Sequence, residues 1–344
     1  MMYNYHRYNF FCGAAALSAA AHDVRRMIMK EYIADAPLFR DPIYDGAADP
    51  VVILNRETDE WWMFYTNRRA VMAGPLYSYV HGTDIGIAVS SDGGKSWLYR
   101  GIAEGLEFEW GRNTFWAPEV IYDGSIYHMY CTYLRGVPYK WGHMSYIVHY
   151  TSRDLHSWRY ESMLDLGSEP VIDACVRQLP DGSWKMWFKQ DAHTYTAVSD
   201  DLYSWRPAGL ELDGRGHEGP NVFTFKGHNW LIADCWAGQM VFRSDTFDNW
   251  EFKNIILDKP GKRCDDGFIG GHAHVVVCGE RAYIFYFVHP ERTEENCKEA
   301  WIHEDYRMKR SSIQVAELEF DGETLICDRD AEKSMLLIPE GQKY

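Results

Sequence analysis

Acidic side chains recur at the start of strand-like segments along the chain. Four of these segments open at or near Asp49, Glu119, Asp173 and Glu218, and a fifth opens at His272. A single acid at the start of a strand is usually a turn or capping residue. Several carboxylates in one place repel one another and cost free energy unless a site uses them. The pattern therefore predicts one functional pocket lined with carboxyl groups, the side chains of acid–base chemistry.

A second pattern shows how distant residues could be brought together. A Ser is followed six residues later by a Trp in four places, with an Asp one or two positions after the Ser: Ser91–Trp97, Ser152–Trp158, Ser199–Trp205 and Ser244–Trp250. Repetition at fixed spacing is typical of supersecondary units that stack on their neighbours. We interpret the repeated Asp as an acceptor for turn amides and the repeated Trp as packing between units.

Each repeat follows a strand, a polar turn and an aromatic-rich strand. The strand pairs begin near residues 49, 117, 173, 218 and 272, and the last unit is completed by the segment from Ser311. Turns such as Asp181-Gly182 supply the positive φ of a tight hairpin. The sequence predicts an all-β fold, a five-bladed β-propeller over residues 37–344. The inner strands of a propeller converge on one axis, so residues far apart in sequence can share a pocket.

Residues 1–36 precede the first blade, and we predict that they form a short helical extension. The stretch from Ala14 to Ile33 is rich in good helix formers. We expect this helix to pack on the propeller or on the second subunit of a homodimer. The segment from Phe10 to Ala21 also loosely resembles a signal peptide, so a cytoplasmic and a periplasmic location both stay open.

Composition argues against several classes of partner. The net charge of −15 argues against a nucleic-acid partner, which would require a basic surface. No segment reaches the ~18 consecutive apolar residues of a membrane span. The eight cysteines show no CxxC and no zinc-site spacing, and we expect them to be free thiols.

The segments that open the five blades resemble the blade motifs of glycoside hydrolase family 43. These segments are ADPVV at 48–52, WAPEV at 116–120, VIDACV at 171–176, EGPNV at 218–222 and GHAHVV at 271–276. The resemblance spans about residues 41–287 and extends to the related propeller families 32, 62 and 117. It implies a glycosidase that hydrolyses O-glycosidic bonds.

In that family three carboxylates act together, and the resemblance assigns them residue by residue. Asp49 matches the general base that activates water, and Glu218 matches the general acid that protonates the leaving oxygen. Asp173 matches the acid that orients the proton donor and adjusts its pKa, although Ala174 replaces the Pro that commonly follows. Asp41 competes with Asp49, which we prefer because it directly opens its strand. The set implies inversion, with base and acid about 6.5–9.5 Å apart.

Substrate contacts are expected from the rim and floor of the propeller funnel. The candidates are Trp116, Glu119, Arg112, Gln190, Trp236, His272 and His274. The two histidines lie on the same face of a strand and resemble a pair in family 117. In some relatives the residue matching His272 touches a metal or a water cluster. The resemblance therefore implies that no cofactor is required for activity. If a structural calcium ion binds near the propeller axis, His272 is its candidate ligand.

The leading hypothesis is an inverting, exo-acting glycoside hydrolase of plant or algal oligosaccharides. Its specificity would be similar to that of arabinofuranosidases and xylosidases, or to that of anhydrogalactosidases. Two alternatives stay open at this point. A phosphorylase similar to family 130 would need a cationic phosphate pocket and no general base. A non-catalytic carbohydrate-binding propeller would have no need of three carboxylates.

Overall fold

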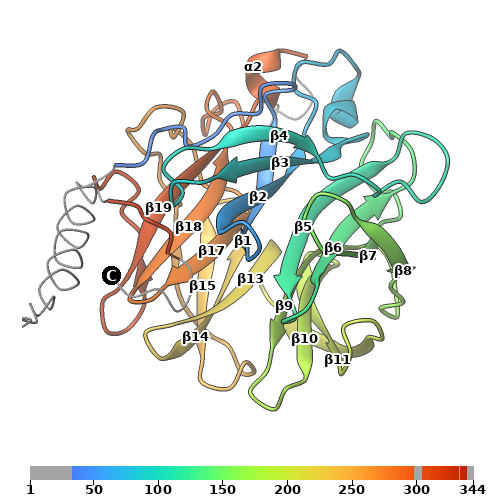
Figure 1. The fold of residues 1–344 in the computed structure, drawn as a ribbon. Coiled ribbons are helices and arrows are strands. Elements are labelled where there is room, and N and C mark those ends of the chain that lie inside the picture. Colours follow the sequence, from blue (N-terminus) through green and yellow to red (C-terminus); the bar gives the residue numbers. More distant parts are fainter. Residues whose placement is uncertain (1–32, 298–303, 333, 339–344) are drawn as a thin grey trace, which may run out of the picture.

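The computed structural model describes residues 33–297, 304–332 and 334–338. These residues form five antiparallel four-stranded sheets, each made of strands consecutive in sequence (Figure 1). Blade I holds β1 (Ala47–Asn55), β2 (Glu60–Asn67), β3 (Asp84–Ser90) and β4 (Leu98–Ile102). Blade II holds β5 (Thr114–Tyr122), β6 (Tyr127–Leu134), β7 (Tyr146–Ser152) and β8 (Arg159–Met163). Blade III holds β9 (Val171–Gln178), β10 (Trp184–Gln190), β11 (His193–Ser199) and β12 (Arg206–Leu212).

The last two blades complete the ring. Blade IV holds β13 (Glu218–Phe225), β14 (His228–Asp234), β15 (Gln239–Ser244) and β16 (Glu251–Ile256). Blade V holds β17 (Ala273–Cys278), β18 (Arg281–Val288), β19 (Ser312–Phe320) and β20 (Leu325–Ile326). The short 3-10 helix η1 (Leu76–Val80) and the single-turn helix α2 (Tyr306–Lys309) lie in connections. Strands β1, β5, β9, β13 and β17 contact their neighbours in a closed circle, so the predicted five-bladed propeller is confirmed.

Four of the five inner strands carry the same irregularity near their start. The strand register shifts at the sequence pairs 49–50, 117–118, 173–174 and 219–220, which is the signature of a β-bulge. The first residue of each pair has a positive φ, at 50°, 40°, 60° and 58° respectively. Pro follows at three of the four positions, where no ladder amide is needed. The bulge re-aims the side chains at the start of the strand toward the propeller axis.

The Ser–Trp element closes the outer turn of blades I to IV. Asp154 illustrates it, because its carboxylate accepts the amides of His156 and Ser157 at 2.9 and 2.8 Å. In blade I the Ser of the motif is Ser90 and not the predicted Ser91. The Ser90 hydroxyl accepts the Gly94 amide at 2.8 Å, and an extra residue in this turn accounts for the shift by one.

The four tryptophans of the element pack between blades, as the sequence predicted. Each ring contacts an aromatic ring on the second strand of the preceding blade, with blade I packing on blade V. The pairs and their centroid distances are Trp97–Phe285 at 6.2 Å, Trp158–Phe64 at 5.8 Å, Trp205–Tyr130 at 5.6 Å and Trp250–Trp187 at 6.4 Å. These contacts bury large apolar surfaces and fix the angle between neighbouring blades.

The two ends of the described chain meet where blade I adjoins blade V. Isolated bridges join Phe39 to Ile313 and Gly46 to Ser311, both on the blade V side. In return, the Leu337 amide donates to the Gly93 carbonyl of blade I at 2.8 Å. The ring is therefore closed by short pairings, because no blade shares a strand between the two ends of the chain.

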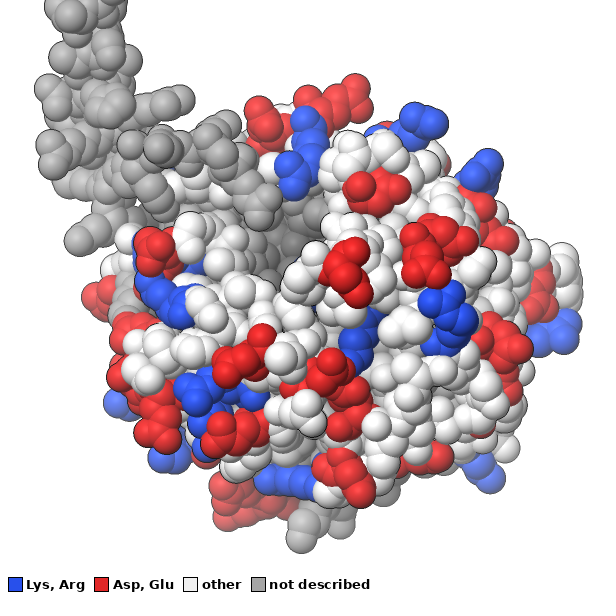
Figure 2. All heavy atoms as spheres, turned by 90° about the horizontal axis from the view of Figure 1, so that it is seen from below, with Lys and Arg blue, Asp and Glu red and all other residues white. Residues whose placement is uncertain are grey.

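The predicted helix at 14–33 lies almost entirely outside the described residues, so the helix and the homodimer built on it stay predictions. In the described part of the chain no helix is long and apolar enough to cross a membrane. The seven cysteines of that part are free thiols. Acidic and basic side chains are interspersed over the face shown in Figure 2.

Candidate functional site

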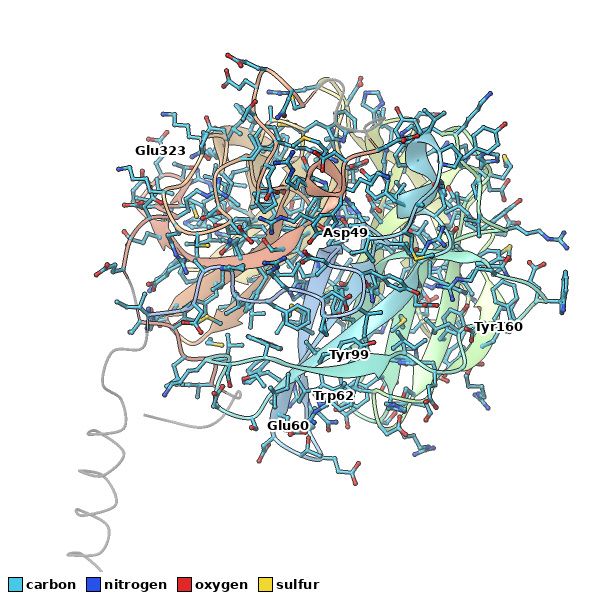
Figure 3. All side chains as sticks on the ribbon, turned by 90° about the horizontal axis from the view of Figure 1, so that it is seen from above. Asp49, Glu60, Trp62, Tyr99, Tyr160 and Glu323 are labelled. Atoms are coloured by element: carbon cyan, nitrogen blue, oxygen red, sulfur yellow. The ribbon has the colours of Figure 1, made fainter. Side chains whose placement is uncertain are left out.

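A cavity of about 540 Å³ opens at the propeller axis, at the end where the inner strands begin. All five blades contribute to its walls, and its charged lining includes Asp49, Asp173, Glu218, Arg68 and Lys189. Figure 3 shows Asp49 near the middle of the molecule, whereas Glu323 and Tyr160 lie at its periphery. The three carboxylates assigned from the sequence therefore line one cavity although they come from three blades.

Asp49 is buried at the bulge of β1 and is held by a cation. The guanidinium of Arg68, which directly follows β2, donates to its two carboxylate oxygens at 3.1 and 3.3 Å. The same guanidinium lies 4.6 Å from the centre of the Phe287 ring, a cation–π contact that fixes its orientation. The pair stabilises negative charge on Asp49 and leaves that carboxylate facing the cavity.

Asp173 occupies the same bulge position in β9. Its amide donates to the Thr132 hydroxyl at 3.0 Å, and its Oδ2 accepts the Gly219 amide at 3.1 Å. The pKa of Asp173 is raised to about 6, mainly by burial and also by the charge of Glu218, while His272 opposes the rise. This carboxyl group therefore changes its protonation state in a weakly acidic medium.

Glu218 opens β13 one residue before the bulge and is the most exposed of the three carboxylates. Its side chain is 28% exposed, against 8% for Asp49 and 6% for Asp173. Lys189, near the end of β10, donates to Glu218 Oε2 at 2.9 Å. Burial lowers the pKa of Lys189, but the charges of Glu218 and Asp173 outweigh burial and hold that pKa above its ordinary value. Glu218 is thus the carboxylate, of the three, that a ligand entering from solvent reaches first.

His272 stands between two of the carboxylates. Its Nδ1 lies 3.9 Å from Asp49 Oδ1 and 4.0 Å from Asp173 Oδ2. The ring packs against the backbone of Gly219, where a Cβ atom would lie 2.7 Å from the imidazole Cγ. Glycine is required there both by this close approach and by the positive φ of the bulge.

Asp234, at the end of β14, is a buried acid that sequence reasoning missed. It pairs across the sheet with Glu218, and its Oδ1 accepts the Trp236 amide at 2.7 Å. Burial raises the pKa of Asp234 to about 7, and the charge of Glu218 adds to the rise. Thr66 and Thr132 occupy the matching position in blades I and II, so a carboxyl group here is peculiar to blade IV among these three.

Four of the expected substrate contacts line the cavity beside the carboxylates: His272, described above, together with Trp116, Trp236 and Gln190. Trp116 and Trp236 present indole faces, and the ring centre of Trp236 lies 5.6 Å from Lys189 Nζ. Gln190 also lines the cavity and donates to the Ser168 hydroxyl. Faces of this kind suit the C–H surfaces of a sugar ring, and the amide suits its hydroxyl groups.

Arg112 and Asp41 lie outside the cavity and serve local structure. Arg112 Nη2 pairs with Asp84 at 2.6 Å, and its Nε donates to the Gly82 carbonyl. Asp41 is buried and accepts the Tyr65 hydroxyl at 2.6 Å. The structure thus places Asp49, and not Asp41, on the cavity wall.

Glu119 and His274 also lie away from the cavity, although both sit on inner strands. Glu119 is buried, its Oε1 accepts the Val176 amide at 2.9 Å, and burial raises its pKa. His274 lines a separate cavity that Val52 and Arg177 also border, and its Nδ1 accepts the Val52 amide at 3.3 Å. Burial lowers the pKa of His274 to about 3, so this ring is neutral.

Arg68 and Lys189 were also missed by sequence reasoning. Arg68 directly follows β2, and Lys189 lies near the end of β10. Both strands are the aromatic-rich second strand of their blade. The second strand runs antiparallel to the first, so its last residues lie beside the acids that open the first strand. A cation at the end of a second strand is therefore the sequence signal that could have selected Arg68 and Lys189. For a metal, the residues described here contain no group of three or more His, Cys, Asp or Glu side chains arranged to hold an ion.

The sequence by itself leads to no match: no protein-family profile and no curated protein matches it. Solved structures do match the fold. A thermostable family-43 glycoside hydrolase superposes with a TM-score of 0.61 and 18% identity, covering 86% of this chain and 99% of its own. A family-43 β-xylosidase/α-arabinofuranosidase from a compost microbial metagenome gives 0.62 and 15%, covering 83% and 94%.

A family-43 β-1,3-galactosidase in complex with galactodeoxynojirimycin matches with a TM-score of 0.61 and 14% identity, covering 87% of this chain and 100% of its own. Each of these proteins is covered almost over its whole length. The fold of the present chain is therefore that of the five-bladed propeller glycoside hydrolases similar to family 43.

Proposed function

We propose that this protein is a glycoside hydrolase that cleaves a glycosidic bond with inversion. The observation that carries the proposal is that Asp49, Asp173 and Glu218, from three different blades, line one cavity together with the indole faces of Trp116 and Trp236. The fold shared with family-43 enzymes supports it. The cavity volume falls within the about 300–1,000 Å³ typical of small-molecule sites.

In this proposal Asp49 is the general base. Its carboxylate is paired with the Arg68 guanidinium and is buried from bulk water. A water molecule held between Asp49 and the sugar would lose its proton to this carboxylate as it attacks the anomeric carbon. His272, 3.9 Å from Asp49 Oδ1, would help to orient that water.

Glu218 is the general acid in this proposal. It lies toward the open side of the cavity, where the leaving group of a substrate must depart. The leaving oxygen would displace Lys189 from the Glu218 carboxyl group as substrate enters. Asp173 and Asp234 place two further acidic groups beside Glu218, and crowding of carboxylates favours keeping a proton among them.

We infer a neutral, short oligosaccharide as the substrate, cut from one end. Arg68 is paired with Asp49 and Lys189 with Glu218, so a sugar acid would have to compete with these carboxylates for either cation, whereas a neutral sugar meets no such competition. The family-43 neighbours support pentose or galactose units: one solved enzyme was bound to xylotriose and is a β-xylosidase/α-arabinofuranosidase, and another is a β-1,3-galactosidase. Plant or algal oligosaccharides supply both.

The test is a hydrolysis panel with a matched inactive variant. Nitrophenyl xylosides, arabinofuranosides and galactosides, together with the matching oligosaccharides, are incubated with the wild-type protein and with Asp49→Asn. Hydrolysis by the wild type, a loss of about 10²–10⁴-fold in the variant, and first release of the inverted anomer by NMR are the expected results.

Three outcomes would contradict the proposal. Turnover that depends on added phosphate, with a sugar phosphate as product, would identify a phosphorylase. Sugar binding without release of any product would identify a binding propeller. Release of the retained anomer would remove the inverting mechanism.

A further inference from the structure

His81 is a cavity residue to which neither the carboxylate assignments nor the blade motifs give a role. It directly follows η1 in blade I, is fully buried and lines the same cavity as Asp49 and Glu218. Its ring centre lies 5.1 Å from that of Trp116 and 5.6 Å from that of Trp141. The imidazole is therefore enclosed by the two indoles that form one wall of the cavity.

One nitrogen of this imidazole is used and the other is not. Nδ1 lies 2.8 Å from the Tyr77 carbonyl oxygen, which can only accept, so Nδ1 carries the proton. Burial lowers the pKa of His81 to about 4, so the ring is neutral and Nε2 presents a lone pair. Nε2 is buried and has no hydrogen-bond partner. A buried polar atom without a partner costs roughly 1–3 kcal/mol, a cost that a bound ligand would remove.

Hydrogen bonds hold the backbone around His81, and the contact of Nδ1 with the Tyr77 carbonyl, together with the two flanking indoles, orients the imidazole on that backbone. Arg69 Nε donates to the His81 carbonyl at 2.7 Å, and Arg69 Nη2 donates to the Ser78 carbonyl at 2.8 Å. Trp116 uses its own N–H on the Val80 carbonyl, so it offers the cavity only its ring. The wall thus combines apolar faces with a single acceptor of fixed orientation.

We propose that His81 Nε2 accepts a hydrogen bond from one hydroxyl group of a neutral sugar ring that stacks on the wall formed by Trp116 and Trp141. The inference rests on the proposed function and deepens it by naming a residue that determines specificity. A lone pair repels the oxygens of a carboxylate or phosphate, whereas a hydroxyl group can donate to it. His81 therefore selects a neutral sugar with a hydroxyl at one position over its deoxygenated or acidic analogues.

The experiment compares two variants that each mimic one side of the imidazole. His81→Asn keeps a donor near Nδ1 and removes the acceptor, while His81→Gln keeps an oxygen near the position of Nε2. Both are made in the Asp49→Asn background so that no sugar is consumed. Binding of methyl β-xyloside, methyl α-arabinofuranoside and methyl β-galactoside is measured by calorimetry, together with their monodeoxy and deoxyfluoro analogues.

The expected result is a loss of about 3- to 10-fold in affinity for His81→Asn and recovery in His81→Gln. With His81 intact, one deoxy analogue binds more weakly than its parent, and the matching deoxyfluoro analogue binds no better, because fluorine cannot donate. In His81→Asn that discrimination disappears. Carboxylates of the same cavity can also accept from a sugar hydroxyl, so only loss of this discrimination in His81→Asn, with its return in His81→Gln, assigns the acceptor to His81. Circular dichroism of both variants confirms that each is folded before binding is compared.

Different failures separate this inference from the proposed function. Equal affinity of His81→Asn and its parent, or a deoxyfluoro analogue that binds as well as its parent at every position, overturns the role of His81 alone. Sugar binding with the expected His81 pattern but no hydrolysis by the wild type overturns the enzymatic function alone. Absence of binding for every sugar of the panel overturns both.

Discussion

Replacing Asp173 by Asn should stabilise the fold at neutral pH while it impairs the site. The carboxyl group is buried, and its pKa lies at about 6 against an ordinary value of 3.8, mainly because burial penalises the charge. Because the folded pKa is the higher one, the group destabilises the fold once it must ionise. The loss of folding free energy caused by ionising Asp173 is absent below pH 3.8, grows between pH 3.8 and 6, and then stays constant. A rise of about 2 pKa units corresponds to ~3 kcal/mol.

Asn removes the charge and keeps a side-chain oxygen for the Gly219 amide, which Asp173 accepts at 3.1 Å. The free energy of unfolding of Asp173→Asn should therefore equal that of the wild type near pH 3.5 and exceed it by ~3 kcal/mol at pH 7. With a melting entropy of ~2.1 cal/mol/K per residue, this difference raises Tm by about 4 °C in a chain of 344 residues.

The assay is thermal unfolding, followed by circular dichroism, of both proteins at several pH values between 3.5 and 8. Asp201→Asn is the matched control, because its exposed carboxylate accepts two turn amides and these hydrogen bonds hold the pKa of Asp201 below its ordinary value. That variant should lose stability at neutral pH. A Tm difference for Asp173→Asn that is constant with pH, or of the opposite sign, would refute the electrostatic reasoning.

Three further changes test the site. Glu218→Gln should reduce kcat/KM by about 10²–10⁴-fold for substrates with poor leaving groups and much less for activated aryl glycosides; equal losses in both classes would remove its role as acid. Gly219→Ala places a Cβ 2.7 Å from the His272 Cγ at a φ of +58°. It should lower the free energy of unfolding by about 1–3 kcal/mol, measured by denaturant titration. An unchanged denaturation midpoint would contradict the packing argument. Asp234→Asn should raise Tm at pH 8 but not at pH 3.5, because burial first, and then the charge of Glu218, raises the pKa of Asp234 to about 7; a gain at both pH values would refute this.

The repeats made the fold predictable, because every blade carries its own strand pattern and turn chemistry. The site was predictable only where the register of the inner strand was read correctly. Glu119 was treated as the blade II counterpart of Asp49, but the bulges align Asp49 with Ala117. Glu119 instead matches Val51, two positions further on, which places its carboxyl group in the interior beside Val176. A shift in register is enough to move a side chain to another wall.

The partners of the carboxylates could not be predicted, because they depend on how neighbouring elements meet in space. Arg68 reaches Asp49 from the adjacent strand end, and Lys189 reaches Glu218 from the preceding blade. His81 is placed by a short 3-10 helix that no hydrophobic pattern reveals. Asp234 looks like an ordinary strand-end acid until its pairing with Glu218 is known.

The short pairings that close the ring create a seam between blades I and V, and the cavity straddles it. Asp49 belongs to blade I and His272 opens blade V, so their 3.9 Å approach crosses this seam. Elsewhere a continuous chain joins neighbouring blades, but blades I and V are held by a shared buried core, which includes the contact of Trp97 with Phe285, and by bridges such as Phe39 with Ile313. Separating these two blades therefore stretches no connecting segment of chain. Loss of this packing would move His272 away from Asp49 while the strands of both blades stay paired, so the geometry around the attacking water depends on contacts between two distant parts of the sequence.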